Sequence, residues 1–298
     1  MRYLVIKAEK LTKTHNRRQG VENITLDVEP GEIYGLLGTD HAGKSTLISL
    51  LAGYLRPSSG RLLVFGKDSY RDARFIREKI GIYPGNYPST SRLTVGELLR
   101  SLGHQQGGML WTEIQKISKQ VDLDLSQSAA TLSRHDRQVF DLLQAFVHRP
   151  ELLLLDEPMD DLNPAIADVF YRLIADARHA GRTVFITSKS FYEMERICDR
   201  VAILHQGKLI SVERGVQLRS RAIRKIEMRF ANPVPKDIFA GITNIHNLTF
   251  EDNKVRCVLN GEPDSLIKSA SQHHVTDFLS FQPSLEEVLA DTYGVKIV

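Results

Sequence analysis

The stretch "GTDHAGKST", Gly38–Thr46, decides what this chain can fold into. Its spacing, Gly38-x4-Gly43-Lys44-Ser45, matches the pattern G-x-x-x-x-G-K-[ST] of a phosphate-binding loop. The two glycines allow backbone N–H groups to wrap a phosphate, and the N-terminus of a following helix adds positive potential there. In this pattern the lysine reaches the β- and γ-phosphates of a nucleotide, and the serine hydroxyl ligates Mg²⁺.

The sequence on both sides of the loop supplies the elements that this pattern requires. The apolar run at 32–37, "EIYGLL", predicts a buried strand, and "KSTLISLLAGYL" predicts a helix that ends at Pro57. "ELLLLDEP" at 151–158 and "TVFITS" at 183–188 predict two more buried strands, with a helix between them that starts at Asn163. Strands that alternate with helices in this way indicate an α/β fold with a mainly parallel sheet.

Two changes of pattern divide the chain. We expect an α/β domain at 1–217, in which the segment at about 88–150 is mostly helical. After it, "IRKIEMRF", "NIHNLTF" and "KVRCVLNG" predict amphipathic strands, and helices are expected near Pro263 and Pro283. The sequence therefore predicts a small α+β domain at 218–298.

Composition excludes several function classes. The net charge is +3, from 39 basic and 36 acidic residues, which gives no electrostatic reason to expect nucleic acid as a partner. The two cysteines, Cys198 and Cys257, stand in no metal-ligand spacing and are typical of free thiols in a reducing cytosol. No apolar run approaches the ~18 residues that a membrane-spanning helix needs, and the N-terminus does not resemble a signal peptide. We expect a soluble, cytoplasmic chain whose membrane role comes from a partner.

A second, acidic stretch supplies chemistry that the loop lacks. "LLLLDEP" ends an apolar strand in acid, which brings Asp156 to the coordination shell of Mg²⁺. Glu157 beside it can polarise an attacking water as a general base. With Lys44 and Ser45, these residues predict a site for ATP and Mg²⁺, in which Lys44 and Glu157 are the candidate catalytic residues. The alternative is a surface acid pair that caps the next segment.

These residues carry a resemblance to a known family. "VEPGEIYGLLGTDHAGKSTLISLLAGYLRPSSG" is similar to the Walker A region of the ATP-binding subunits of ATP-binding cassette (ABC) transporters. "HRPELLLLDEPMDDLNP" resembles their Walker B motif and D-loop, and "CDRVAILHQGKLI" resembles their closing hairpin. The tail, with "QPSLEEVLADTYG", resembles the end of the drug-exporter-like (ABC-2 type) branch, so the resemblance covers nearly the whole chain.

The resemblance implies a fold, a ligand and partners. It implies a P-loop NTPase with a mainly parallel core sheet, an antiparallel β subdomain, a helical subdomain and a small α+β appendage. In the family, two subunits form a head-to-tail dimer, and each ATP lies between the Walker motifs of one subunit and the signature loop of the other. This implies a second ABC ATPase subunit, in a homodimer or heterodimer, and a separate permease that holds the chain on the cytoplasmic face of the membrane. The residues expected around the nucleotide are Gly38, Thr39, Asp40, His41, Ala42, Gly43, Lys44, Ser45, Thr46, His15 and Lys189.

The signature motif departs most from the family. Where the family has L-S-G-G-Q, this chain has Leu132-Ser133-Arg134-His135-Asp136. The family's glycines let backbone N–H groups close on the γ-phosphate, whereas Arg134 and His135 add side chains there and Asp136 adds a like charge. Ser133-x-x-Asp136 also fits a capping box that starts a helix, and this is the role we expect the stretch to keep. Arg134 can still attract phosphate from a distance.

Other positions in the chain also depart from the family. Gly85 replaces a glutamine, Lys189 replaces the switch histidine, and Asn163 replaces the D-loop aspartate. Lysine can hold a γ-phosphate as a point charge, but it cannot relay a proton near neutral pH. His41 replaces a loop glycine. His15 stands where an aromatic side chain stacks on adenine, and a plain surface histidine is an equal alternative.

The retained and altered positions together favour one function. Residues that grip Mg-ATP are retained, whereas those that clamp, sense and couple are altered. We therefore expect an ABC exporter subunit that binds ATP and hydrolyses it poorly or only with a partner, and that docks its permease near Gly85 and the helical segment after it. The alternatives are an ordinary hydrolysing subunit of a homodimer, a non-transporting scaffold or regulator of a membrane complex, and a cytosolic ABC protein that acts on ribosomes or DNA.

Overall fold

The chain forms two compact units, each with its own hydrophobic core. A computed structural model describes residues 3–15, 18–84, 93–103, 108–160, 162–215, 223–281 and 284–293. The first unit comprises Met1–Lys189 and Cys198–Val212, and the second comprises Ser190–Ile197 and Glu213–Val298. The domain boundary expected at 217–218 lies outside the described residues.

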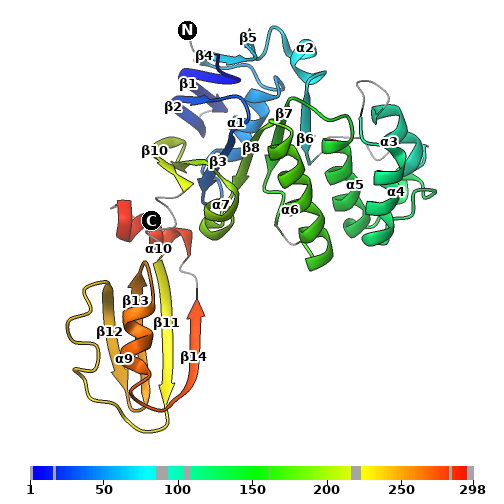
Figure 1. Ribbon diagram of the computed structural model, residues 1–298. Helices are drawn as coiled ribbons and strands as arrows, with labels where there is room; N and C mark the ends of the chain where they lie inside the picture. Colours follow the sequence, from blue (N-terminus) through cyan, green and yellow to red (C-terminus); the bar gives the residue numbers. More distant parts are fainter. Residues whose placement is uncertain are drawn as a thin grey trace. The chain divides into compact units, whose positions relative to one another are not determined.

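A six-stranded sheet forms the centre of the first unit (Figure 1). Its order is β10-β9-β3-β8-β7-β6, in which the five strands from β9 to β6 are parallel. In that order the strands are Lys208–Arg214, Arg200–His205, Ile33–Gly38, Thr183–Ser188, Leu152–Asp156 and Ile80–Tyr83. β3 and β8 are buried along their whole length, as expected for parallel strands covered on both faces. Because parallel strands end at one edge, the residues that follow β3, β7 and β8 come together there.

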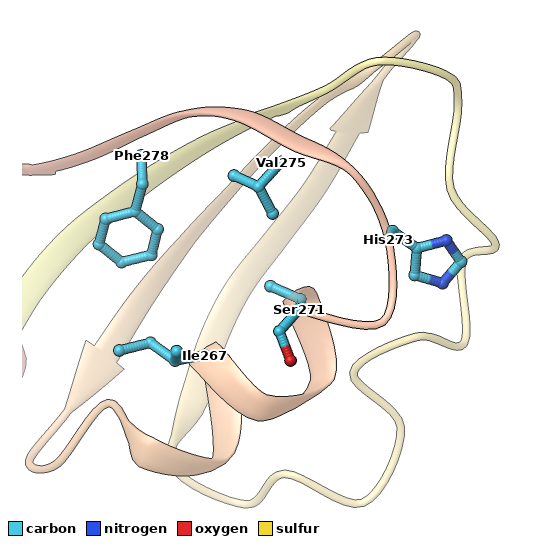
Figure 2. Close-up of a pocket in the computed structure, with 6 residues that line it drawn as sticks. Ile267, Ser271, His273, Val275 and Phe278 are labelled. Carbon is cyan, nitrogen blue, oxygen red and sulfur yellow. The ribbon is translucent and has the colours of Figure 1, made fainter.

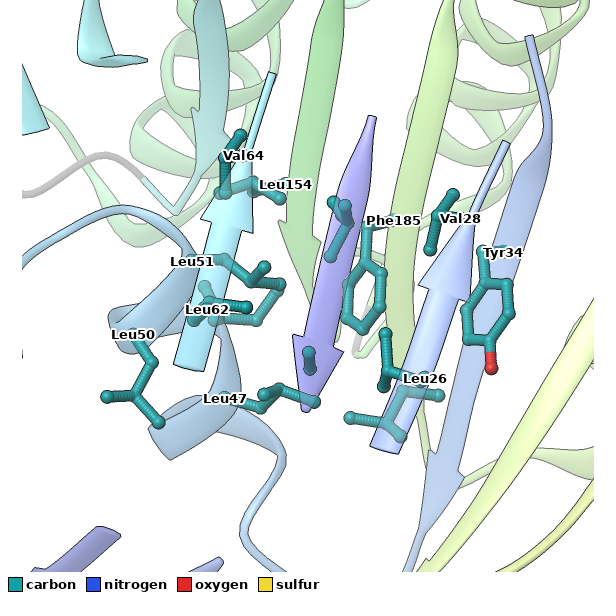
Figure 3. Close-up of a cluster of buried hydrophobic side chains, with 14 of the residues drawn as sticks. Leu26, Val28, Tyr34, Leu47, Leu50, Leu51, Leu62, Val64, Leu154 and Phe185 are labelled. Carbon is teal, nitrogen blue, oxygen red and sulfur yellow. The ribbon is translucent and has the colours of Figure 1, made fainter. Parts of the chain in front are cut away.

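A second, antiparallel sheet packs against the same core. Its order is β2-β1-β4-β5, and these strands are Arg18–Val28, Ile6–His15, Ser59–Val64 and Lys67–Asp68. Helix α1, Lys44–Leu51, buries its leucines among strands of both sheets, as Figure 3 shows for Leu47, Leu50 and Leu51. A fully buried leucine contributes roughly 1.5–3 kcal/mol to stability, so this helix is fixed firmly behind the loop that precedes it.

The end of α1 differs from the sequence-based prediction. The helix ends at Leu51 and not at Pro57. Gly53 has a φ of +70°, and a Cβ there would lie 2.4 Å from the carbonyl oxygen of Ser69. The left-handed glycine turns the chain before the proline is reached.

The remaining helices of the first unit follow the expected pattern. Between β6 and β7 the described chain is mostly helical, as predicted for the helical subdomain. These helices are α3 (Val95–Gly103), α4 (Trp111–Gln120), the short 3₁₀ helix η1 (Ala129–Thr131) and α5 (Arg134–Val147), with α2 (Ala73–Arg77) preceding β6. Helix α6, Pro164–His179, is capped by Asn163, whose Oδ1 accepts the N–H of Ile166 at 2.9 Å, which confirms the predicted helix start.

The second unit is a four-stranded antiparallel sheet with helix α9 against one face (Figure 1). Its order is β12-β13-β11-β14, and the elements are Ile245–Glu251, Lys254–Asn260, Ile223–Phe230 and Val275–Phe281, with α9 at Asp264–Ala270. Helices α7 (Phe191–Ile197) and α10 (Leu285–Tyr293) also belong to this unit. Strand β14 was not predicted, because it lies at the sheet edge and most of its side chains are exposed. In the described part of the chain, no helix is long and apolar enough to cross a membrane.

One buried hydroxyl in the core has a testable cost. The Tyr34 ring stacks on Phe185 with centroids 5.7 Å apart, and its hydroxyl has no hydrogen-bond partner among the described residues (Figure 3). Tyr34→Phe is expected to raise the free energy of unfolding by about 1 kcal/mol, because the substitution removes a desolvated polar group and keeps the ring. Urea denaturation measures this, and a loss of stability would show that the hydroxyl has a partner, such as a buried water.

Candidate functional site

The loop at Gly38–Thr46 has a backbone that only glycine fits at two places. It connects the end of β3 to the start of α1. Gly43 caps α1 with a φ of +107°, and a Cβ there would lie 2.2 Å from the carbonyl oxygen of Gly20. A Cβ at Gly38 would lie 2.7 Å from the carbonyl oxygen of Leu204. The spacing of the sequence pattern therefore corresponds to a tight turn ahead of a helix N-terminus.

His41 occupies a strained position inside this loop. Its φ of +61° lies in the left-handed region that favours glycine, and its side chain is exposed. The loop therefore keeps a left-handed conformation at a position where the resemblance led us to expect glycine. The neighbouring Asp40 is also exposed, whereas Ala42 is buried.

Lys44 places a buried positive charge inside the loop. Its side chain is 4% exposed, and its Nζ donates to the carbonyl oxygens of Gly38 and Thr39, each at 2.7 Å. The same Nζ lies 2.9 Å from Oε1 of Glu157. A buried ammonium is costly unless it is paired and hydrogen-bonded, and here the loop and one carboxylate satisfy it. Lys44 and Glu157, predicted from separate motifs, thus meet in the structure.

Thr187 fixes the orientation of the acidic pair, and the sequence analysis missed it. Asp156 ends β7 and is in register with Thr187 of the neighbouring strand β8. The buried Thr187 hydroxyl donates to Oδ1 of Asp156 at 2.6 Å and accepts the N–H of Glu157 at 3.0 Å. Glu157 itself has a φ of +48°. Only the predicted parallel pairing of the two strands could have indicated Thr187.

These residues fit a nucleotide with its magnesium ion. The loop offers a helix N-terminus and a buried ammonium to phosphate, and Ser45, the second residue of α1, exposes a hydroxyl beside them. Among the described residues, no group of three or more histidines, cysteines or acids could hold a metal ion alone. Mg²⁺ commonly binds through one or two protein groups together with substrate phosphates. Asp156 and Ser45 can provide the protein groups.

Lys189 lies at the same edge of the sheet, directly after β8. Its Nζ is 2.8 Å from Oδ2 of Asp160, and the two side chains are 47% and 42% exposed. The hydrogen bond and charge of Asp160 raise the pKa of Lys189, and the carboxylates of Asp40 and Glu157 add to this effect. Lys189 is therefore a permanent cation, and it cannot take the proton-transfer role of a histidine near neutral pH.

The altered signature stretch begins a helix, as predicted. Ser133 caps α5, and its Oγ accepts the N–H of Asp136 at 3.1 Å. The Asp136 carboxylate accepts the Ser133 hydroxyl at 2.7 Å. One of the two hydrogen bonds of a capping box is therefore present, namely the one that Ser133 Oγ accepts from the backbone N–H of Asp136. His135 Nδ1 lies 3.3 Å from Nδ2 of Asn163, so two altered positions, in the signature and the D-loop, contact each other.

Helix α5 carries a buried acid about two turns after the cap. Asp141 is 6% exposed, and Nε of Arg137 donates to both of its carboxylate oxygens at 3.1 and 3.2 Å. Burial raises the pKa of Asp141 to about 6, against the opposing effect of Arg137. Two further predictions fall outside the described part of the chain, namely Gly85 and the side chain of His15.

The second unit has a hollow of its own. Figure 2 shows side chains from α9, from β14 and from the turn between them facing this hollow. Its volume is about 340 Å³. Its lining is Ile267, Ala270, Ser271, His273, Val275 and Phe278. The lining is mostly apolar, and its residues include no lysine or arginine that could bind a phosphate.

Comparison with known proteins identifies the family. Residues 21–160 match the family described as "ABC transporter". The bacitracin transport ATP-binding protein BcrA of Bacillus licheniformis is 31% identical over 76% of this chain and 76% of its own length. This chain belongs to the ABC transporter family. The daunorubicin/doxorubicin resistance ATP-binding protein DrrA of Streptomyces peucetius is similarly 31% identical, over 72% of this chain and 67% of its own.

The likeness to ABC proteins extends through the second unit. The linearmycin resistance ATP-binding protein LnrL of Bacillus subtilis is 27% identical over 97% of this chain and 98% of its own length. A solved ATP-binding subunit of an ABC transporter superposes with a TM-score of 0.62 at 24% identity, over 70% of this chain and 90% of that one. A dimeric ATP-binding cassette bound to ADP and phosphate gives a TM-score of 0.60 at 20% identity, over 70% and 98%. The fold of the first unit is that of an ABC cassette, as the sequence predicted.

Proposed function

We propose that this chain is the ATP-binding subunit of an ABC exporter and that it hydrolyses ATP slowly or only with a partner subunit. The observation that carries the proposal is the buried Lys44 ammonium, which the loop and Glu157 hold at the N-terminus of α1. The names of three relatives, which refer to bacitracin transport, linearmycin resistance and daunorubicin/doxorubicin resistance, support an antibiotic-like cargo.

Each retained residue has a proposed role in binding Mg-ATP. Lys44 and the backbone N–H groups of the loop bind the phosphates, and Ser45 and Asp156 hold Mg²⁺. Glu157 is the proposed general base. Lys189 is proposed to contact the γ-phosphate, and His15 is proposed to stack on adenine. When bound, ATP with Mg²⁺ supplies the phosphoanhydride bond whose hydrolysis drives transport.

Three features of the site support slow hydrolysis. The signature stretch carries the side chains of Arg134 and His135, and the second of these contacts Asn163. Lys189 cannot relay a proton near neutral pH, and its ammonium is paired with Asp160. The pre-placed donors that hydrolysis requires around the γ-phosphate are therefore altered, whereas the groups that bind the nucleotide are retained.

The helical part of the first unit is the proposed docking surface for a permease. A hollow of about 280 Å³ lies between α3 and α4, and its apolar lining includes Leu99, Leu110, Trp111 and Ile114. Leu110 is 64% exposed. An exposed apolar rim around a hollow is typical of a surface that another protein covers. We propose a head-to-tail dimer as the second assembly, with either another copy or a related subunit.

The chain is expected in the membrane fraction only when its permease is co-expressed. Leu110→Asp should weaken this co-sedimentation at least about tenfold, because it places a charge in a desolvated apolar contact. Ile267→Asp is a matched control, since Ile267 is 48% exposed and lies in the second unit. Sedimentation with each candidate permease measures the effect. Equal loss in both variants would contradict this docking surface, and no association with any permease would favour a scaffold or regulator.

A further inference from the structure

The pair formed by Lys189 and Asp160 suggests a function of its own. We propose that Asp160 is a specificity-determining residue, which limits the preference of the site for ATP over ADP. Its carboxylate competes with the γ-phosphate for the Lys189 ammonium. This inference rests on the proposed binding of ATP at the loop. It adds a residue, Asp160, that the sequence analysis did not assign to the site.

The pair lies at the edge of the sheet that carries the phosphate-binding loop. Asp160 follows β7 and Lys189 follows β8, and these strands are paired in register at Asp156 and Thr187. The distance of 2.8 Å between Lys189 Nζ and Asp160 Oδ2 is that of a direct charge-assisted hydrogen bond. The same edge holds Glu157, so the pair adjoins the residues proposed to bind the terminal phosphate.

Asp160 is also held from the side of helix α5. Nε2 of Gln138 lies 3.5 Å from the carbonyl oxygen of Asp160. Three residues later, Asn163 caps α6 and contacts His135. The Asp160 carbonyl and the residue three positions later are thus both in contact with side chains of helix α5.

Charge decides what happens when a nucleotide enters. Lys44 is paired with Glu157, and Lys189 is paired with Asp160, so each lysine at this edge already has a carboxylate partner. A terminal phosphate carries more negative charge than a carboxylate and offers three acceptor oxygens. Lys189 can exchange Asp160 for this phosphate, but the pair must break first. Because ADP lacks the γ-phosphate, the cost of breaking the pair applies to ATP alone.

The expected size of this effect is modest. Both side chains are nearly half exposed, and ion pairs of this kind are weak in water. Asp160→Asn frees Lys189 and should tighten the binding of Mg-ATP about two- to fivefold, with little change for Mg-ADP. Lys189→Ala should weaken Mg-ATP and leave Mg-ADP unchanged. With Lys189 already replaced by alanine, Asp160→Asn should have little further effect, because Asp160 acts through the lysine.

Titration calorimetry with Mg-ATP and with Mg-ADP tests the inference. It compares the wild-type chain, Asp160→Asn, Lys189→Ala and the variant that carries both substitutions. The matched control is Asp264→Asn, which removes an ion pair of the same 2.8 Å length, that with Lys268 in the second unit. Both partners in each pair are exposed enough that the variants should fold.

Each other outcome contradicts a specific statement. If Asp160→Asn leaves the ratio of ATP to ADP affinity unchanged, or lowers it, Asp160 does not limit the preference. If it raises ATP affinity equally without Lys189, Asp160 repels phosphate directly, and the proposed competition for the lysine is wrong. If the wild-type chain binds neither nucleotide, the proposed function itself is contradicted, and this inference falls with it.

Discussion

Restoring the signature and switch positions together is expected to raise the rate of ATP hydrolysis about 10²–10³-fold. The variant combines Arg134→Gly, His135→Gly, Asp136→Gln and Lys189→His. Transition-state charge on the γ-phosphoryl group needs pre-placed donors, and removing one such donor commonly costs about 10²–10³ in kcat. The substitutions return uncrowded backbone N–H groups to the signature and an imidazole to the switch position. Steady-state phosphate release at saturating Mg-ATP measures the gain.

Controls separate this gain from other effects. Single reversions should do little, because groups that act as a unit are not additive. Glu157→Gln in the restored protein should abolish the gain. Two new glycines in α5 cost about 1 kcal/mol each, so thermal unfolding must show that the variant is folded. The Ser133 cap should survive, because its donor is the backbone N–H of residue 136. If the wild type already runs at the restored rate, Arg134 and Lys189 are working substitutes and the site is not impaired.

Lys44→Ala is expected to remove nearly all of the stabilisation that Mg-ATP gives the chain. At a ligand concentration of about 100 Kd, binding stabilises a folded protein by about 2.7 kcal/mol. The substitution removes the buried ammonium at the loop and leaves Glu157 without that partner, so phosphate loses its main attraction. The shift in melting temperature with and without Mg-ATP measures this, and not the melting temperature itself, because the substitution can change stability on its own.

The matched control for Lys44→Ala is an exposed lysine whose side chain forms a surface ion pair in the second unit. Lys268→Ala meets this condition, because the Lys268 side chain is 75% exposed and pairs with Asp264 in the second unit. It should keep the full shift. An unchanged shift in Lys44→Ala would show that the nucleotide binds elsewhere or that the loop does not need its lysine.

Local sequence pattern was enough to predict the buried strands and helix α6. The buried strands β3, β7 and β8 are continuous apolar runs, and α6 has a cap and apolar residues at helical spacing. Two features were not predictable in this way. Helix α1 ends at Leu51, because the left-handed Gly53 turns the chain where the Ser69 carbonyl of a distant segment leaves no room for a Cβ. Strand β14 exposes Phe278, Leu279 and Phe281, so it lacks the buried alternate face that marks a strand.

The candidate site shows the same division between local and distant information. Lys44, Asp156 and Glu157 were predictable because each belongs to a motif with fixed spacing. Thr187 was not, because its role comes from the register of two strands far apart in sequence. The contacts of Asp160 with Lys189 and of His135 with Asn163 likewise join distant segments. Sequence identified the altered positions, and the structure shows that some of them contact each other or have acquired new partners.

The fate of bound ATP tests the proposal most directly. The purified wild-type chain is mixed with a slight deficit of Mg-ATP labelled in the γ-phosphate, and the nucleotide that stays with the protein is analysed over time. Retained Lys44 and altered signature and switch residues predict that ATP binds and is recovered intact from the protein. Rapid conversion to ADP and free phosphate by the chain alone would contradict slow hydrolysis, and failure to retain any nucleotide would contradict ATP binding at the loop.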